Sequence, residues 1–421
     1  MYKLELKRLL KTRSTWILMA AALLVTLILC CVNIFNPYYY AYDGESLHGL
    51  AATEMRRIVT QSSEGEWTPE RIRDVFAQLA EANANYGVAA GGETNDSFEG
   101  LAGDGAEPGA VAGDTSTFLR SIPQVFDVQY VNEITPDMAA QYYTQRKAYI
   151  EEAMTLNYGP AAAEAAIRLD EDTAEPFYYE FGFGTGSNIA STLPVCLFAV
   201  AVACSVICAP VFASDYSTGA DDIQRCARYG RKRLGRFRLL AAMTLSTVLY
   251  VVCAGVFVAL TLAVFGDDKT SAQLALDALV LGNITMNGVL ILTLAAGLLS
   301  VFAMTAFTLW LSARMRSGVA VLAVTLAVAM TPTFLIVLLR ESAVGDWLRL
   351  LLPSGGLGLG TGMFVDIQVG KFLTIGSLAI WTPFVMLAAP VIEAPVFALL
   401  AQRAYVRRED AALPRRRPRH A

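Results

Sequence analysis

The sequence contains very little histidine, and this scarcity limits the chemistry open to the chain. Only His48 and His420 occur among 421 residues. They cannot supply the histidine sets of zinc enzymes or a histidine base beside a nucleophile. The chain also lacks the GxxxxGK[S/T] pattern of a phosphate-binding loop, so we do not expect it to hydrolyse a nucleotide. We therefore expect no catalytic residue, no metal site and no cofactor in this chain.

Cysteine is absent from the long segment 36–188, so no disulfide holds this segment together. The seven cysteines lie in apolar stretches or in a short basic connection: Cys30, Cys31, Cys196, Cys204, Cys208, Cys226 and Cys253. Cys204 and Cys208 share a helix face. Packing of small residues explains such a pair better than a metal site does.

Charged residues are also scarce, at 17% against 55% hydrophobic residues, and the mean hydropathy is +0.44. This composition indicates an all-α integral membrane protein, because a span needs about 20 apolar residues. Six segments are long enough: 16–35, 189–213, 239–265, 279–311, 319–339 and 372–401.

The distribution of Lys and Arg predicts the orientation of these six spans. With both termini in the cytosol, the inside segments hold 21 of the 33 basic residues, including a basic tail at 402–421. The outside segments hold the other 12, spread over many more residues. Short basic loops stay on the cytoplasmic side. We therefore expect a multi-pass protein of the plasma membrane with both termini in the cytosol.

Residues 1–15 form a basic amphipathic segment before the first span. On a helical wheel, an apolar face containing Tyr2 and three leucines lies opposite the basic residues Lys3, Lys7, Arg8 and Lys11. Such a helix lies in the membrane interface with its cations toward anionic headgroups. A basic anchor that only sets the orientation explains the same pattern.

The segment 36–188 forms an extracellular insert between spans 1 and 2. Helix starts are predicted at Thr68-Pro69, near Thr135-Pro136 and at Pro160, whereas 87–114 is rich in Gly, Ala, Asp and Glu and is predicted to be flexible. Aromatic residues between 177 and 183 are expected at the membrane interface. The insert holds 25 acids and 8 bases, a formal charge of −17 (8 − 25). This charge either attracts a cationic substrate or partner, or only keeps the insert soluble.

Two further features lie near the last span. The connection 340–371 is too apolar and glycine-rich for an open loop, so we expect a re-entrant hairpin packed against the spans. Glu393 lies within the sixth span, and an intramembrane carboxylate is a functional candidate. Because Glu393 is close to the cytoplasmic edge, a structural role, such as reaching water or pairing with a base, is the competing interpretation.

The connection 214–238 is the most informative part of the chain. It places seven basic residues between Arg225 and Arg238, after Ser217, Thr218 and two aspartates that suit the start of a helix. Gly230 is suited to end that helix. A short exposed helix between two spans is expected to contact a cytosolic partner.

Four segments of the chain resemble the permease subunits of ATP-binding-cassette (ABC) exporters of the type-2 membrane family. They are YKLELKRLLKTR at the start, VFASDYSTGADDIQRCARYGRKRLGRFRLLA after the second span, LLPSGG before the last span, and QRAYVRRE at its exit. The resemblance covers residues 1–35 and 189–409 but not the insert. It implies two permeases, identical or different, with two copies of a separate cytoplasmic ATPase subunit that binds ATP and Mg²⁺. It also implies that residues 1–15 form a connecting helix and that these residues form or frame a coupling helix: Asp215, Tyr216, Ser217, Gly219, Asp222, Ile223, Arg225 and Arg228.

The expected function is therefore that of a permease in an ATP-driven exporter, embedded in a lipid bilayer and without a nucleic-acid partner. One alternative is an ion-coupled secondary transporter that uses Glu393, although no repeat or second buried carboxylate is visible. Another is a membrane-anchored sensor or assembly factor that binds a partner through the insert. The cargo stays open among peptides, lipids, drugs and ions.

Overall fold

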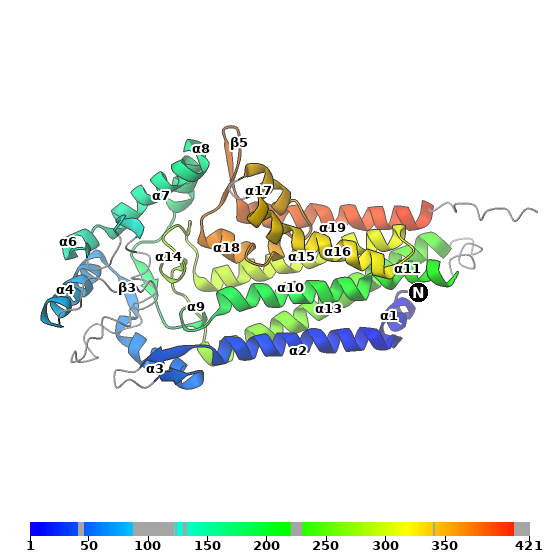
Figure 1. The fold of residues 1–421 in the computed structure, drawn as a ribbon, viewed down its shortest axis with the longest axis horizontal. Helices are drawn as coiled ribbons and strands as arrows, with labels where there is room; N and C mark the ends of the chain where they lie inside the picture. The colour runs from blue at the N-terminus through cyan, green and yellow to red at the C-terminus, as the bar shows by residue number, and fades with distance from the viewer. Residues whose placement is uncertain are drawn as a thin grey trace, which may run out of the picture.

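The computed structural model describes residues 1–40, 46–86, 122, 124–128, 133–219, 230–339 and 342–407. Within these residues, six helices are long and apolar enough to cross a membrane. They are α2 (Arg13–Phe35), α10 (Ile189–Cys208) with its continuation α11 (Pro210–Thr218), α13 (Gly230–Phe265), α15 (Met286–Arg314), α16 (Gly318–Leu338) and α19 (Thr382–Arg407). They lie side by side along the long axis of the molecule (Figure 1). The prediction of a mainly helical, multi-pass membrane protein is confirmed.

The central helix of this bundle is α15, which contacts α10, α11, α13, α16 and α19. Its buried face carries many small residues, which allow neighbouring backbones to approach closely. At Gly297, a Cβ atom would lie 2.7 Å from the Tyr250 hydroxyl of α13. That hydroxyl donates a hydrogen bond to the Leu294 carbonyl over 2.6 Å. A glycine is therefore required at this contact between α13 and α15.

By contrast, α2 lies at the edge of the bundle and buries a narrow seam of small or polar residues: Thr15, Ala22, Thr26, Cys30 and Asn33. Asn33 is fully buried and joins three helices. Its amide nitrogen donates to Thr261 of α13 over 3.2 Å, and its oxygen accepts from Thr192 of α10 over 3.3 Å. Polar side chains and small residues thus hold α2 against the bundle.

Two predicted span boundaries are wrong. The fourth span was expected from residue 279, but α15 begins at Met286, and 279–285 belong to the non-helical part of the connection before it. The sixth span was expected from residue 372, but residues 372–381 form the antiparallel pair β5 (Phe372–Ile375) and β6 (Leu378–Trp381). Both segments are apolar and adjoin a span, so their hydropathy resembles that of a span, although Ile375 and Leu378 at the β5–β6 turn are 57% and 56% exposed.

The predicted amphipathic start forms α1 (Tyr2–Lys11), which is shorter than the expected 1–15. Thr12 has an extended backbone and separates α1 from α2. The Tyr2 hydroxyl donates to the Thr244 hydroxyl over 2.9 Å, and α1 lies against α13. One face of α1 is therefore occupied by the protein itself.

The insert is mainly helical, as predicted, with helices starting at Pro69, Pro136 and Pro160. Its elements are α3 (Leu50–Thr60), η1 (Gln61–Ser63), α4 (Pro69–Tyr86), α6 (Pro136–Ala139), α7 (Tyr142–Tyr158), α8 (Pro160–Asp170) and α9 (Phe183–Gly186). The helix predicted to start near Thr135-Pro136 ends at Ala139, and α7 begins after a break at residues 140–141. The predicted flexible segment 87–114 lies outside the described residues.

Two antiparallel strand pairs in this region were not predicted: β1 (Tyr38–Tyr40) with β2 (Ser46–His48), and β3 (Gly65–Trp67) with β4 (Phe177–Tyr179). The placement of the aromatic residues 177–183 at a membrane interface is wrong for most of them. Phe177 and Tyr179 are at most 1% exposed and pack with Trp67 and Tyr143 in a core of the insert. An aromatic strand that packs in a small core cannot be distinguished by composition from an interfacial belt.

A fully buried arginine ties the insert to the connection between α13 and α15. Arg146 of α7 donates to both carboxylate oxygens of Asp170, over 2.8 and 3.0 Å. It also donates to the carbonyls of Ala278 (2.9 Å) and Val280 (2.7 Å). The guanidinium lies over the Phe177 ring at 5.2 Å. Four segments are therefore joined through one side chain.

A buried carboxylate forms a second joint in the same region. Asp268, which is fully buried, accepts hydrogen bonds from the backbone N–H groups of Gly184 (2.8 Å), Thr185 (3.3 Å) and Thr270 (2.9 Å). These bonds attach α9 to the connection that follows α13.

The connection between α16 and α19 is compact, and much of it is buried against α15, α16 and α19. It contains α17 (Ala343–Leu350), η4 (Gly355–Leu357) and α18 (Met363–Gln368), followed by the β5–β6 pair. Fully buried Arg349 forms a two-pronged ion pair with Asp366, over 3.0 and 2.8 Å. On its outer side, the Phe372 ring lies 6.3 Å from that of Tyr158 at the end of α7. The insert therefore also contacts this connection.

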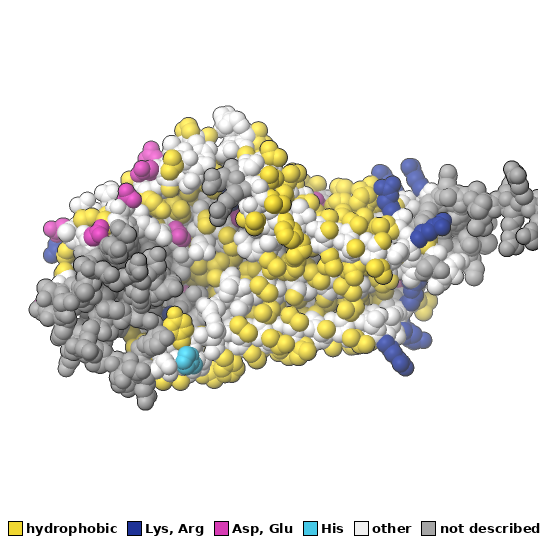
Figure 2. Space-filling view, viewed as in Figure 1, with side chains coloured by type: hydrophobic (Ala, Val, Ile, Leu, Met, Phe, Trp, Pro, Cys, Tyr) yellow, Lys and Arg dark blue, Asp and Glu magenta, His cyan; other side chains and the backbone are white. Residues whose placement is uncertain are grey.

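Charge separates the two ends of the bundle (Figure 2). We call the end that carries the N-terminus the basic end, and the opposite end the insert end. The exposed basic side chains at the basic end are Lys3, Lys7, Lys11, Arg13, Lys232, Arg233, Arg236, Arg314, Arg316, Arg403 and Arg407. Met1 and Arg407, the first and last described residues, both lie there (Figure 1). The described acidic side chains in that view gather over the insert (Figure 2).

Candidate functional site

The junction of α10 and α11 is the first component of a polar site at the basic end. Because α11 begins with Pro210, the backbone N–H groups of its first turn need acceptors outside the helix. Ser312 of α15, which is fully buried, accepts from the N–H groups of Phe212 and Ala213, both over 3.0 Å. The same hydroxyl donates to the Ala209 carbonyl over 2.7 Å. One hydroxyl of the central helix thus fixes where α11 starts.

One turn further on, Asp215 of α11 faces Arg238 of α13. Arg238 Nη1 donates to Asp215 Oδ2, and the two side chains are 2% and 8% exposed. A charge at this depth needs an opposite charge and hydrogen bonds to offset the loss of water. The pair connects the helix that enters the connection 219–229 with the helix that follows it.

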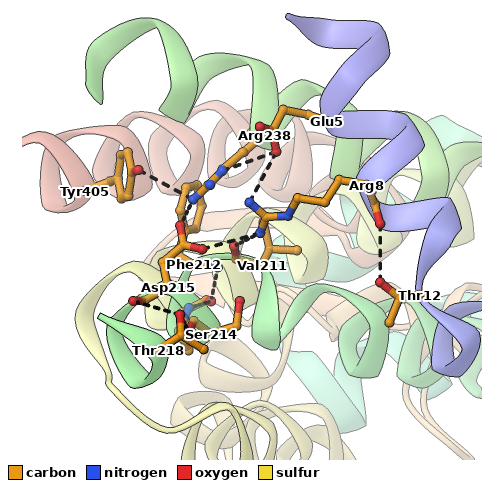
Figure 3. Close-up of polar contacts among 12 residues, drawn as sticks. Glu5, Arg8, Thr12, Val211, Phe212, Ser214, Asp215, Thr218, Arg238 and Tyr405 are labelled. Atoms are coloured by element: carbon orange, nitrogen blue, oxygen red, sulfur yellow. Dashed lines mark hydrogen bonds and ion pairs between the residues drawn. The ribbon is translucent and has the colours of Figure 1, made fainter. Parts of the chain in front are cut away.

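The helix α1 contributes two further charges to this pair (Figure 3). Arg238 Nε donates to Glu5 Oε2 over 3.3 Å. Arg8 lies 3.6 Å from both Glu5 and Asp215, and it donates to the Val211 carbonyl over 3.3 Å. Two arginines and two carboxylates therefore alternate, and their formal charges cancel.

A tyrosine of α19 completes the arrangement. The Tyr405 hydroxyl accepts from Arg238 over 3.5 Å, and its ring packs on that of Phe212 with centroids 4.8 Å apart. At Gly235 of α13, a Cβ atom would lie 2.8 Å from the Tyr405 ring, so the glycine allows α13 and α19 to approach. We call Glu5, Arg8, Asp215, Arg238 and Tyr405 the four-helix cluster, because they join α1, α11, α13 and α19.

This arrangement joins four helices through buried and half-buried charges. Its ionic side chains contact one another, and no group of three His, Cys, Asp or Glu residues in the described ranges is arranged to hold a metal ion. A buried charged network resists separation of its members, because each would be left unpaired in an apolar environment. Movement of one of the four helices is therefore expected to move the others.

The structure describes half of the predicted coupling residues. Asp215 is in the four-helix cluster, and the Tyr216 hydroxyl donates to the Ala313 carbonyl over 3.2 Å. Ser217 and Thr218, predicted to begin a docking helix, instead form the last turn of α11, and Gly219 follows with a left-handed backbone (φ 73°). Glycine is favoured there because it adopts this conformation without strain.

The other coupling residues, Asp222, Ile223, Arg225 and Arg228, lie outside the described residues, so the docking helix stays a prediction. Gly230, expected to end that helix, is the first residue of α13.

The four basic residues of α1 divide into two kinds. Lys3, Lys7 and Lys11 are exposed, in keeping with the predicted contact with headgroups. Arg8 is only 38% exposed and belongs to the four-helix cluster. Arg8 also lies 3.6 Å from two carboxylates, and its contact with headgroups stays a prediction.

Glu393 of α19 is half-buried, and its Oε2 atom has no hydrogen-bond partner within the described part of the chain. It is not part of the four-helix cluster. The pairing with a base that its structural interpretation allowed is absent from the described residues, whereas its contact with water and its functional role stay predictions.

Sequence reasoning missed the roles of Glu5, Arg238, Tyr405 and Ser312. Glu5 is the only acid among the basic residues of α1, and Arg238 directly precedes an apolar run. An acid among basic residues and an arginine beside an apolar run were the available signals that these two charges need partners within the protein. No local pattern distinguishes Tyr405 or Ser312.

No family model matches this chain, and comparisons with curated proteins and with solved structures also give no match.

Proposed function

We propose that this chain is the membrane-spanning permease subunit of an ATP-driven exporter of the ABC type-2 kind. Its basic end faces the cytosol, where two copies of a separate ATPase subunit bind ATP and Mg²⁺. A second permease, identical or different, completes the transporter in the plasma membrane. The four-helix cluster is the observation that carries the proposal.

The connection 219–229 starts about one turn after Asp215 and ends about two turns before Arg238. Both of its ends are therefore attached to the cluster. A force applied to this connection by a partner would reach α11 and α13 directly, and α1 and α19 through Glu5, Arg8 and Tyr405. This is the connectivity that a permease moved by a separate ATPase needs.

The energy for this movement comes from differential binding. An ATPase pair that binds one arrangement of the connection more tightly than another shifts the permease between the two arrangements. The cluster makes the shift collective, because its charges stay paired only when the four helices move together. The separate binding and transmission steps can be tested with different variants.

The binding step is tested with Arg225→Glu combined with Arg228→Glu. We expect this variant to insert normally but to lose co-purification with the ATPase and ATP-dependent export. The matched control is Arg314→Glu with Arg316→Glu, an equal charge change on another basic connection. Export at the native level by the first variant would refute the assigned contact.

The transmission step is tested with Asp215→Asn. We expect the ATPase still to bind and to hydrolyse ATP, while export per ATP hydrolysed falls, because Arg238 and Arg8 lose a shared charge partner. Transport by the purified single chain in vesicles without any ATPase would overturn the whole proposal.

A second candidate function rests on Glu393, whose half-buried carboxylate has an unpartnered oxygen within the described residues. In an ion-coupled secondary transporter, this group would carry a proton or cation across the bilayer. Glu393→Gln would then abolish transport driven by an ion gradient. Under the ABC proposal, the same variant keeps ATP-dependent export.

A further inference from the structure

The helix α3 of the insert lies directly across the outer ends of two apolar helices. It begins beside α2, because the Gly49 N–H donates to the Pro37 carbonyl over 2.8 Å. The Phe35 ring lies 3.1 Å from where a Gly49 Cβ would be. Near its other end, Arg57 donates to the Val264 carbonyl in the last turn of α13 over 2.9 Å. The contacts at both ends place α3 where α2 and α13 leave the apolar bundle (Figure 1).

The side of α3 that faces the protein is polar. Thr53 and Thr60 are at most 3% exposed. Arg56 donates to the Thr185 carbonyl over 3.2 Å, and the Arg57 guanidinium lies 5.4 Å from the centre of the Phe181 ring. Together with Ala52, these side chains make up the inner face of the helix.

The side of α3 that faces away from the protein carries two large apolar side chains and one ion-paired carboxylate. Leu50 and Ile58 are 52% and 55% exposed. Glu54 lies one turn from each of them, is 63% exposed and lies 3.3 Å from the Arg57 guanidinium. A helix on the surface of a water-soluble domain turns its large apolar residues inward. Two exposed apolar residues around an ion-paired carboxylate suit the boundary between lipid and headgroups.

The neighbouring surface indicates which environment this is. Phe35 and Val32 of α2 are 59% and 46% exposed, and they continue the apolar surface of a helix that is long enough to span a membrane. Tyr38, which follows α2, is 49% exposed, and tyrosine is enriched at membrane interfaces. Leu50, at the start of α3, therefore lies beside the exposed apolar surface of α2.

We propose that α3 is an interfacial helix whose Leu50 and Ile58 side chains enter the bilayer at the insert end. Its partner is the lipid surface, and its inner polar face holds the insert against α2 and α13. This makes α3 the counterpart of α1 on the opposite side of the membrane. The proposal needs only a membrane-spanning bundle, and it is independent of the exporter function.

The test places a nitroxide spin label at Ile58→Cys in the full chain, reconstituted in phosphatidylcholine–phosphatidylglycerol nanodiscs. Cys31 and Cys226 are first replaced, because Cys31 is exposed and Cys226 lies in the basic connection. Val32→Cys supplies the lipid reference, and Glu151→Cys on the exposed side of α7 supplies the water reference. Accessibility to oxygen and to a water-soluble nickel chelate is measured at each site.

We expect the label at position 58 to resemble that at position 32, with oxygen access far above nickel access. A label that resembles position 151 would overturn the proposal. Exclusion from both reagents would also overturn it, because it would indicate a protein partner such as a second copy of the chain.

A second variant tests the same idea without a label. Leu50→Asp with Ile58→Asp is expected to speed amide hydrogen exchange across α3 in nanodiscs, because two charges would have to leave the bilayer. Leu156→Asp, at an 84% exposed leucine of α7, is the control and should leave exchange in α3 unchanged. Equal exchange in α3 in both variants would contradict the proposal.

Discussion

Replacing Arg146 by Met should loosen the joint between the insert and the connection that precedes α15. The substitution keeps much of the apolar stem and removes the guanidinium, which uses four hydrogen bonds to hold Asp170, Ala278 and Val280. Asp170, which is only 5% exposed, would lose its ion-pair partner and would keep one side-chain hydrogen bond, from the Thr173 hydroxyl.

The cost follows from this burial. Removing one member of a buried ion pair destabilises a protein by about 3–5 kcal/mol, mainly because the other charge is left uncompensated. The two carbonyls lose charge-assisted bonds as well, but these losses belong to the same network and do not add fully. Local opening that costs 3–5 kcal/mol less corresponds to amide exchange faster by roughly one hundred to a few thousand-fold.

The assay is hydrogen exchange with mass spectrometry on the full chain in nanodiscs, following peptides from α7, α8 and residues 276–285. Arg168→Met is the matched control, because its ion pair with Glu164 is 65% and 74% exposed and such pairs contribute little. Arg146→Lys should give an intermediate effect, since a lysine keeps the charge but not the fork geometry. Exchange in Arg146→Met at the rate of the Arg168→Met control would refute the reasoning.

Three other perturbations have outcomes that the structure predicts. Ser312→Ala leaves two buried N–H groups of α11 without their acceptor. Each unsatisfied group should lower the free energy of unfolding by about 1–3 kcal/mol, so the melting temperature of the protein should fall. Gly370→Ala should speed exchange in the connection between α16 and α19, because Gly370 has φ 57° and a Cβ would lie 2.5 Å from the Leu279 carbonyl. Burial raises the pKa of Asp268 from 3.8 to about 6, against the backbone hydrogen bonds that lower it. Its stabilising contribution is therefore complete below pH 3.8 and is lost as the pH rises through about 6, a change of about 3 kcal/mol in the local unfolding free energy. After correction for intrinsic rates, exchange around α9 should be slower at pH 5 than at pH 7, and Asp268→Asn should remove this difference.

The bundle was largely predictable because hydropathy over about 20 residues reports a span directly. The errors fall where an apolar segment that is not helical adjoins a span. Residues 279–285 and 372–381 are apolar and adjoin a span, yet the first packs around Arg146 and the second forms a strand pair. Hydropathy does not report whether an apolar segment is helical.

The four-helix cluster was only partly predictable, because its members come from distant parts of the chain. Asp215 was identified through its neighbours in sequence, but Glu5 and Arg238 are separated by 233 positions. A local sequence pattern indicates where each helix lies in the chain, but not which residues of different helices contact one another. The exposure of Leu50 and Ile58 on α3 was missed for a related reason, since an amphipathic pattern does not say which face the protein occupies.

The narrow seam of α2 has a consequence for biosynthesis. Asn33 enters the membrane with the first span, but Thr192 and Thr261 follow it by 159 and 228 residues. At about 5–20 residues per second, a ribosome needs roughly ten to forty seconds to deliver these partners. During this interval the nascent first helix carries an unsatisfied carboxamide, so the translocon or an insertase must shelter it until the second and third spans arrive.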